Sequence, residues 1–329
     1  MQCTKKTSEP NDILFSLRAP VGPTNINNIK ACIGRGLAAI RCSKEIELKY
    51  LLHYLRKNEK RIESLGSGST FKAITIGTLK ELKIPLPPLP QQKKIAAILD
   101  AADLYRQKTK ALIAKYDELS QSLFLDMFGD PVRNEKGWEK IELQSLAKIS
   151  SGSTPSRKDE SYFTGIIPWV KTGEVNGKLI LDTEEKISKE ALDNSSCKIY
   201  PSGSLIIAMY GQGKTRGQVG MLGIEATTNQ ACAVIPPSSK MNYLFLITLI
   251  KLCYNDLRDL RRGGNQPNLN IGLIKTYKVL FPSLNLQSKF AERFQSIESQ
   301  KSQAQQSLEK AEELFNSLLQ RAFKGELST

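Results

Sequence analysis

The sequence is poor in the residues that build metal sites. Its 329 residues contain one histidine, His53, and six cysteines, none of them in a C-x-x-C pair. Because zinc sites in proteins use closely spaced cysteines and histidines, we expect no metal site and interpret the cysteines as reduced thiols. His53 lies in the helix-like stretch "YLLHYLRK" with no obvious partner. A packing or surface role is therefore favoured over catalysis.

Long apolar runs are also missing. The longest, residues 243–250, is far shorter than the roughly 20 residues that cross a bilayer. The first twelve residues, "MQCTKKTSEPND", lack the apolar core of a secretion signal. We therefore predict a cytoplasmic protein that has no membrane partner.

Acidic residues are outnumbered by basic ones. Lys and Arg total 47 against 33 Asp and Glu, so the formal net charge is +14. An excess of this size favours a polyanionic partner, because neutralising phosphates releases condensed counterions. A solvated basic surface is the alternative that charge alone leaves open.

One stretch resembles a phosphate-binding loop. The strand-like run 205–209 leads to Gly213, Lys214 and Thr215, with Ala208 at the first motif position. Such a loop needs a helix directly after it, whose N-terminus helps to hold the phosphates. The next eight residues contain three glycines, and each glycine costs a helix about 1 kcal/mol. We predict a turn into another strand and no nucleotide site.

The chain contains an internal repeat. Residues 66–87 match residues 261–282 at a constant offset of 195, and the register continues downstream, with Gln92 on Gln287. Upstream the offset drifts, yet "DILFSL" still falls on "SLIIAM". A repeat of this length indicates duplicated architecture. The counterpart of "MYGQGKTRG" is "LRAPVGPTN", without Gly-Lys-Thr, which fits a variable recognition loop on a shared scaffold.

Each copy ends in a predicted long helix. Residues 91–128 contain neither proline nor glycine, and core positions recur at spacings of four and three in both copies, as at Leu99 and Phe294. Heptads over more than about 30 residues are typical of coiled coils. Each helix would be about 55 Å long. We predict that residues 91–128 and 287–323 pair with each other in antiparallel orientation.

Between the helices we predict a mixed α/β domain. Asn176-Gly177 is a hairpin signal, and residues 242–260 have helical character. The first copy lacks about 55 residues of the equivalent opening. The fold class is therefore α+β, with two mixed α/β domains, the first truncated, separated by long helices that pair as an antiparallel coiled coil. The expected boundaries are 1–86 for the truncated first domain, 87–130 for the first helix, 131–283 for the second domain and 284–329 for the second helix.

These residues resemble a known family. The opening "GWEKIELQSLAKISSGSTPSRKDESYFTGIIPWVKTGEV" and the junctions "GGNQPNLNIGLIKTYKVLFPSLNLQSKF" and "IPLPPLPQQKKIAAILD" are similar to the specificity subunit of type I restriction–modification enzymes. The resemblance covers essentially the whole chain. It implies a target recognition domain in each copy that contacts one half of a bipartite site on double-stranded DNA, with the helices setting the distance between the halves.

The resemblance also implies partners. Modification (methyltransferase) subunits would dock along the helices and carry S-adenosylmethionine, and restriction (translocase and nuclease) subunits would use ATP and Mg in bacterial defence. This chain would be non-catalytic and hold no cofactor, which fits its lack of a methyltransferase signature. Three alternatives stay open: a coiled-coil scaffold without DNA binding, an inactive or silent recombination cassette, and pairing with a second copy of itself.

The candidate DNA-binding residues fall in three loop groups. Arg, Lys, Asn and Gln are the side chains best suited to reading base edges, and glycines beside them would allow close approach to a groove. The candidates are Tyr210, Gln212, Lys214 and Arg216, then Asn229 and Gln230, then Arg261, Arg262, Asn265 and Gln266. A solvated loop residue is the alternative for any one of them.

Overall fold

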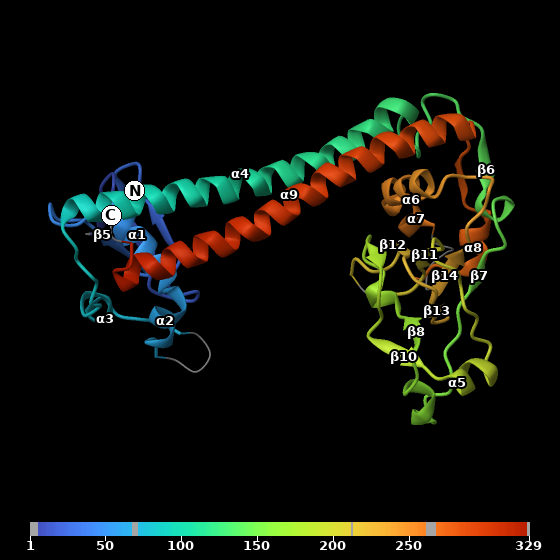
Figure 1. Ribbon diagram of the computed structural model, residues 1–329, viewed down its shortest axis with the longest axis horizontal. Helices are drawn as coiled ribbons and strands as arrows, with labels where there is room; N and C mark the ends of the chain where they lie inside the picture. The colour runs from blue at the N-terminus through green and yellow to red at the C-terminus, as the bar shows by residue number, and fades with distance from the viewer. Residues whose placement is uncertain (1–5, 68–71, 212, 261–267, 328–329) are drawn as a thin grey trace. The chain divides into compact units, whose positions relative to one another are not determined.

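The computed structural model describes residues 6–67, 72–211, 213–260 and 268–327 (Figure 1). Two compact units make up the chain. Residues 1–114 with 301–329 form unit 1, and residues 115–300 form unit 2. Across the described ranges, no helix combines the length and the apolar character that crossing a membrane would require.

The largest sheet of unit 2 carries its core. Its strands, in spatial order, are β7 (Ser150–Ser151), β14 (Cys232–Ile235), β11 (Leu205–Ala208), β12 (Val219–Leu222) and β9 (Leu179–Ile180). β11 is antiparallel to β14 and β12, whereas β9 runs parallel to β12. Every residue of β11 and β14 is buried. Alternate side chains of these strands enter two different apolar clusters, so the sheet is covered on both faces.

Two smaller sheets and several helices complete unit 2. The sheets are β10 (Glu185–Ile187), β8 (Ile167–Val170) and β13 (Thr227–Thr228), and β15 (Lys278–Leu280) with β6 (Lys140–Glu142). The helices are α5 (Lys189–Asp193), α6 (Tyr243–Leu252), α7 (Tyr254–Asp259) and α8 (Ile271–Thr276), with 3-10 turns η1 (Leu143–Ser145), η2 (Glu160–Phe163) and η3 (Thr172–Glu174). Asn242 caps α6 by accepting from the N–H groups of Leu244 and Phe245. The expected helix over 242–260 is therefore two helices that meet at Cys253.

The prediction of a β-hairpin at Asn176-Gly177 is wrong. Gly177 has a φ of +83°, so a bend does form there. The strands on either side, β8 and β9, belong to different sheets and do not pair with each other. The predicted turn into a strand after Thr215 is confirmed, because the chain there leads into β12 and not into a helix.

Unit 1 repeats part of this architecture. It contains β1 (Thr7–Ser8) with β4 (Ala31–Cys32), the sheet β3 (Thr24–Ile26), β2 (Ile13–Ser16) and β5 (Leu37–Ile40), and helices α1 (Leu48–Lys57), α2 (Glu59–Ser64) and α3 (Ile76–Lys80). The N–H of Ile74 donates to the Leu17 carbonyl at 2.9 Å, and Leu269 donates to Met209 at 3.1 Å at the matching place in unit 2. Matched backbone hydrogen bonds in both units confirm the internal repeat.

The two long helices are α4 (Leu89–Phe128) and α9 (Leu284–Lys324). In unit 1, Leu99 of α4 packs with Phe315 and Ala322 of α9, and further along α4 Lys110 pairs with Glu312 at 2.8 Å. Residues later in α4 contact residues earlier in α9, so the two helices are antiparallel in this unit. In unit 2, the rings of Phe124 and Phe128 pack edge-on against Phe290, near the start of α9. The predicted antiparallel pairing is confirmed within each unit.

The cysteines depart from the expectation in one place. Cys42, Cys197, Cys232 and Cys253 are free thiols. Cys32 is disulfide-bonded, so the interpretation of all six cysteines as reduced is wrong for this residue. The sequence offered no C-x-x-C spacing that would have indicated it.

Candidate nucleic-acid interface

The first two groups of candidate residues leave the large sheet of unit 2 at the same end. β11 ends at Ala208, which lies opposite Cys232, the first residue of β14. The loop between β11 and β12 and the turn before β14 therefore leave the sheet at the same end. Leu269, which follows the third candidate group, donates its N–H to the Met209 carbonyl at this end. Gln212, Arg261, Arg262, Asn265 and Gln266 lie outside the described residues.

The loop after β11 is held by α7. The Tyr254 hydroxyl donates to the Lys214 carbonyl at 2.7 Å, and the Arg258 guanidinium donates to the Arg216 carbonyl at 3.0 Å. Gly217 has a φ of +84°, and a Cβ placed on it would lie 2.9 Å from the Arg258 side chain. Only glycine suits this position. The backbone of residues 214–217 is therefore held in place by α7.

The side chains of this loop divide by exposure. Tyr210 is 40% exposed and Lys214 is exposed. Arg216 is only 8% exposed, and its Nε has no hydrogen-bond partner among the described residues. Tyr210 and Lys214 can reach a ligand from the surface, whereas the buried Arg216 side chain cannot.

In the turn before β14, Asn229 stabilises the backbone and Gln230 is exposed. Asn229 is half-buried, donates its N–H to the Val170 carbonyl at 2.9 Å, and accepts from the N–H of Ala231 at 3.2 Å. Gln230 is exposed and its side-chain oxygen accepts from the Thr154 hydroxyl. Asn229 therefore sets the turn, and Gln230 presents an amide at the surface.

Asn229 and Gln230 line a cavity of about 510 Å³ that the sequence analysis missed. Its other walls come from the segment 154–174 and from Glu184. The Arg157 guanidinium lies 4.0 Å from the ring centroid of Phe163 and 5.0 Å from that of Trp169. The sequence did contain an indication of these residues. Both "STPSRKDE" and "PWVKTGEV" belong to the opening of the second domain, which resembles the family.

Charges in this cavity are largely paired. Arg157 contacts Glu185 at 2.7 Å, and Lys171 contacts Glu184 at 2.8 Å and Glu185 at 3.0 Å. The hydrogen bond from Arg157 lowers the pKa of the Glu185 carboxyl, and the hydrogen bond to Glu184 raises the pKa of Lys171. Both cations already face carboxylates. The cavity therefore suits hydrogen bonding to a neutral polar group better than binding of a phosphate.

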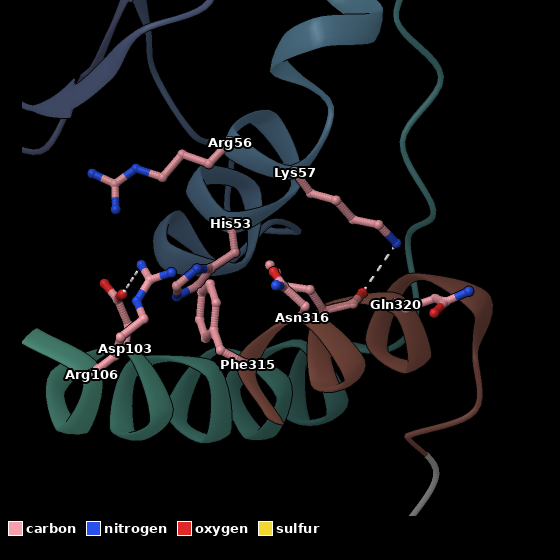
Figure 2. Close-up of a pocket in the computed structure, with 9 residues that line it drawn as sticks. His53, Arg56, Lys57, Asp103, Arg106, Phe315, Asn316 and Gln320 are labelled. Atoms are coloured by element: carbon pink, nitrogen blue, oxygen red, sulfur yellow. Dashed lines mark hydrogen bonds and ion pairs between the residues drawn. The ribbon is translucent and has the colours of Figure 1, made fainter. Parts of the chain in front are cut away.

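Unit 1 contains a second cavity, of about 590 Å³, between α1 and the paired helices (Figure 2). Lys57 donates to the Leu319 carbonyl at 3.1 Å, and Arg106 contacts the Asp103 carboxylate at 2.5 Å. His53 is buried, with its Nε2 2.9 Å from an Asp100 oxygen and its ring edge-on to Phe315. The contacts of Lys57 and His53 attach α1 to α9 and α4, whereas the Arg106–Asp103 pair lies within α4. The predicted packing role of His53 is confirmed, with Asp100 as the partner that the sequence did not reveal.

The thiols and carboxylates of the described residues do not form a reactive cluster. No group of three potential metal ligands occurs in the described parts of the chain. Burial raises the pKa of the Cys232 thiol, and it raises that of Cys253 to about 11. Both thiols stay protonated at neutral pH, and a protonated thiol is a poor nucleophile.

Known proteins show the same organisation. Residues 2–115 and 135–313 match the family described as type I restriction modification DNA specificity domain. The chain is similar to the type I restriction enzyme MjaIX specificity subunit of Methanocaldococcus jannaschii, with 25% identity over 99% of this chain and 80% of the relative. The MjaVIII specificity subunit of the same organism shares 24% identity over 82% of this chain and 68% of the relative.

A solved structure shares the fold. The crystal structure of a type I restriction-modification system S subunit from M. genitalium aligns with a TM-score of 0.61 at 19% sequence identity. The alignment covers 96% of this chain and 83% of that chain. The fold of this chain therefore also occurs in a protein of distant sequence.

Proposed function

Because the chain belongs to the family of type I restriction modification DNA specificity domains, we propose that it recognises DNA for a type I restriction–modification complex. In this proposal the chain catalyses no reaction and holds no cofactor. S-adenosylmethionine belongs to modification subunits that dock along α4 and α9, and ATP and Mg belong to restriction subunits. The site of action is the cytoplasm, where the double-stranded DNA target lies.

The proposal is supported by the loop after β11 and the turn before β14, which leave the sheet at the same end. Tyr210, Lys214 and Gln230 are exposed side chains on loops whose backbones are held by α7 and by β14. A rigid scaffold that presents variable loops is the usual way to position contacts with a ligand. We assign base contacts to Gln230 and Tyr210 and a phosphate contact to Lys214.

The buried Arg216 has a different role in this proposal. Its backbone carbonyl ties the loop to Arg258, so it supports the loop instead of reading DNA. Half-site recognition by this chain rests on unit 2, which contains β6 to β10. The described residues of unit 1 contain no counterparts of these strands. The alternatives are a scaffold that binds proteins without DNA, an inactive cassette, and association with a second copy that supplies another reader.

A salt series with a randomised duplex pool tests the proposal. The full chain is mixed with its modification subunit, bound duplexes are recovered and sequenced, and affinity for the enriched sequence is measured from low to high salt. We expect one enriched half-site motif and an affinity that falls linearly on a log–log plot. A scaffold predicts no enrichment at any salt concentration, and an inactive cassette predicts no assembly with the modification subunit.

Matched lysine variants locate the interface. Lys214→Ala should reduce the salt slope by about one, as expected for the loss of one phosphate contact. Lys240→Ala is the control, because this exposed lysine follows the far end of β14 and contacts the Ser145 carbonyl. Equal slopes for the two variants would contradict the placement of DNA at the candidate loops. ATP binding that Lys214→Ala abolished would restore the phosphate-loop interpretation.

A further inference from the structure

The positive charge of the chain is concentrated in unit 1. This unit contains 24 Lys and Arg against 13 Asp and Glu, a net charge of +11. Unit 2 contains 23 Lys and Arg against 20 Asp and Glu, a net charge of +3. All the candidate DNA-binding residues belong to unit 2. Most of the charge that favours a polyanionic partner is therefore in the other unit.

Matched hydrogen bonds align the ends of the two sheets. The N–H of Leu17, directly after β2, donates to the Gly36 carbonyl at 2.8 Å. The N–H of Met209, directly after β11, donates to the Ala231 carbonyl at 2.8 Å. Leu17 is therefore the structural counterpart of Met209, and Gly36 is that of Ala231.

This alignment places two arginines where unit 2 has its exposed candidates. Arg18 directly follows the first of these positions in unit 1, and Tyr210 follows it in unit 2. Arg35 directly precedes the second position in unit 1, and Gln230 precedes it in unit 2. The end of the sheet that presents an aromatic ring and an amide in unit 2 thus presents two guanidinium groups in unit 1.

A lysine from a third segment lies at the same end of the sheet. The backbones of Arg18 and Ala73 form an antiparallel bridge, and Lys72 directly precedes Ala73. A Cβ placed on Gly36 would lie 3.7 Å from the Arg18 side chain, so that side chain lies beside the turn that carries Arg35. We call Arg18, Arg35 and Lys72 the basic cluster.

The basic cluster keeps its charge available to a ligand. All three side chains are exposed. No ion pair of the described residues involves them, unlike the cations of the cavity in unit 2, which face carboxylates. The Glu59 side chain lies against Gly22, further along the loop that begins with Arg18, and it forms no ion pair with the cluster.

The residue types at this end of unit 1 suit phosphate better than base edges. The segments 17–23, 33–36 and 66–73 contain no Asn or Gln, the side chains that pair with adenine. Arg and Lys are the usual partners of phosphate oxygens, and such contacts fix the position of a protein on a duplex without reading its sequence.

We propose that the basic cluster of unit 1 binds the phosphate backbone of double-stranded DNA and reads no base. This inference rests on the proposed function and divides its work: unit 2 selects the half-site, and unit 1 supplies affinity that does not depend on sequence. Neutralising three phosphates releases their counterions, so the cluster contributes about 2.7 to the slope of log affinity against log salt.

The test uses the full chain and a labelled duplex that lacks the enriched half-site, with binding followed by fluorescence anisotropy across a salt series. The variant that combines Arg18→Ala, Arg35→Ala and Lys72→Ala should lower the slope by about 2.7 and weaken binding at low salt at least tenfold. The half-site motif recovered from a randomised pool should stay the same, because unit 2 is unaltered.

The matched control removes three charges elsewhere in unit 1: Lys44→Ala, Lys93→Ala and Lys94→Ala. These exposed lysines lie beyond the other end of β5, where the Gln92 amide donates to the Glu45 carbonyl. Equal slopes for the two triple variants would overturn the proposal. Unchanged duplex affinity with loss of the modification subunit would assign the cluster to an acidic protein surface and also overturn it. The proposed function fails when no motif is enriched, so the two failures are distinguishable.

A conservative variant separates phosphate binding from base reading. Arg18→Lys combined with Arg35→Lys keeps both charges but removes the guanidinium fork that reads guanine. We expect the salt slope and the enriched motif of the unaltered chain. A motif that changes with this variant would show that the arginines read bases, which contradicts the proposal.

Lysine footprinting on the unaltered chain gives a measurement that does not depend on variants that fold. Acetylation by an N-hydroxysuccinimide ester is followed by mass spectrometry, with and without the duplex that lacks the half-site. The duplex should slow acetylation of Lys72 at least tenfold and leave that of Lys44 unchanged. Equal protection of the two lysines, or protection of neither, would overturn the proposal.

Discussion

Replacing Gln287 with leucine should weaken the junction between α9 and the recognition-type domain of unit 2. The Gln287 side chain is fully buried at the beginning of α9. Its amide oxygen accepts from the N–H of Asn242 at 2.8 Å, and its amide nitrogen donates to the Pro282 carbonyl at 2.8 Å. Asn242 caps α6, so one side chain joins the long helix to the core helix.

The expected magnitude follows from the two hydrogen bonds. Leucine has a similar volume but leaves the Pro282 carbonyl buried without a partner, which costs about 1–3 kcal/mol. The N–H of Asn242 is only partly buried, so its loss costs about 1 kcal/mol. We therefore expect the free energy of unfolding of unit 2 to fall by about 2–4 kcal/mol.

Denaturant unfolding followed by tryptophan fluorescence measures this change. The two tryptophans, Trp138 and Trp169, both lie in unit 2, so the signal reports that unit. Gln295→Leu is the control on the same helix, because Gln295 is exposed. Gln92→Leu makes the equivalent change in unit 1 and should leave the tryptophan transition unchanged. A Gln287→Leu transition that coincides with that of Gln295→Leu would refute the reasoning.

Three further predictions concern the helices, one ion pair and the relative stability of the two units. Leu99→Asp places a charge in the buried contact with Phe315 and should release docked modification subunits, as measured by size-exclusion chromatography; unchanged assembly would contradict this role of the helix pair. The hydrogen bonds from Arg41 lower the pKa of Asp12 below its ordinary value of 3.8. The stability gained from Asp12 should therefore be fully present above about pH 4 and disappear as the pH falls through the lowered pKa. In thermal unfolding, Asp12→Asn should be less stable than the unaltered chain at pH 7, and this difference should shrink as the pH falls below 4. A difference independent of pH would contradict the ion pair. Limited proteolysis with mass spectrometry should cut before residue 85 first and spare residues 138–329, because apolar side chains of β5, α1 and α3 line an open cavity in unit 1. Equal resistance of the two regions would contradict this.

Much of the architecture was predictable because it is encoded in periodic and repeated patterns. The heptad spacing around Leu99 and Phe294 and the absence of interior breakers predict α4 and α9 to within three residues at each end. The offset that places Gln92 on Gln287 holds in three dimensions, since both amides accept from the backbone and donate to a proline carbonyl. Such features depend on local spacing, which the sequence displays directly.

The sequence alone determined the repeat, the long helices and the turn into a strand after Thr215, because each follows from local sequence patterns. Only the tertiary structure decided which candidate side chains are accessible. Arg216 and Lys214 look equivalent in sequence, yet Arg216 is buried in the folded chain and Lys214 is exposed. The pairing of Arg157 and Lys171 with Glu185 joins residues from separate segments. The sequence could not show this pairing, because burial and charge pairing depend on which distant segments pack together.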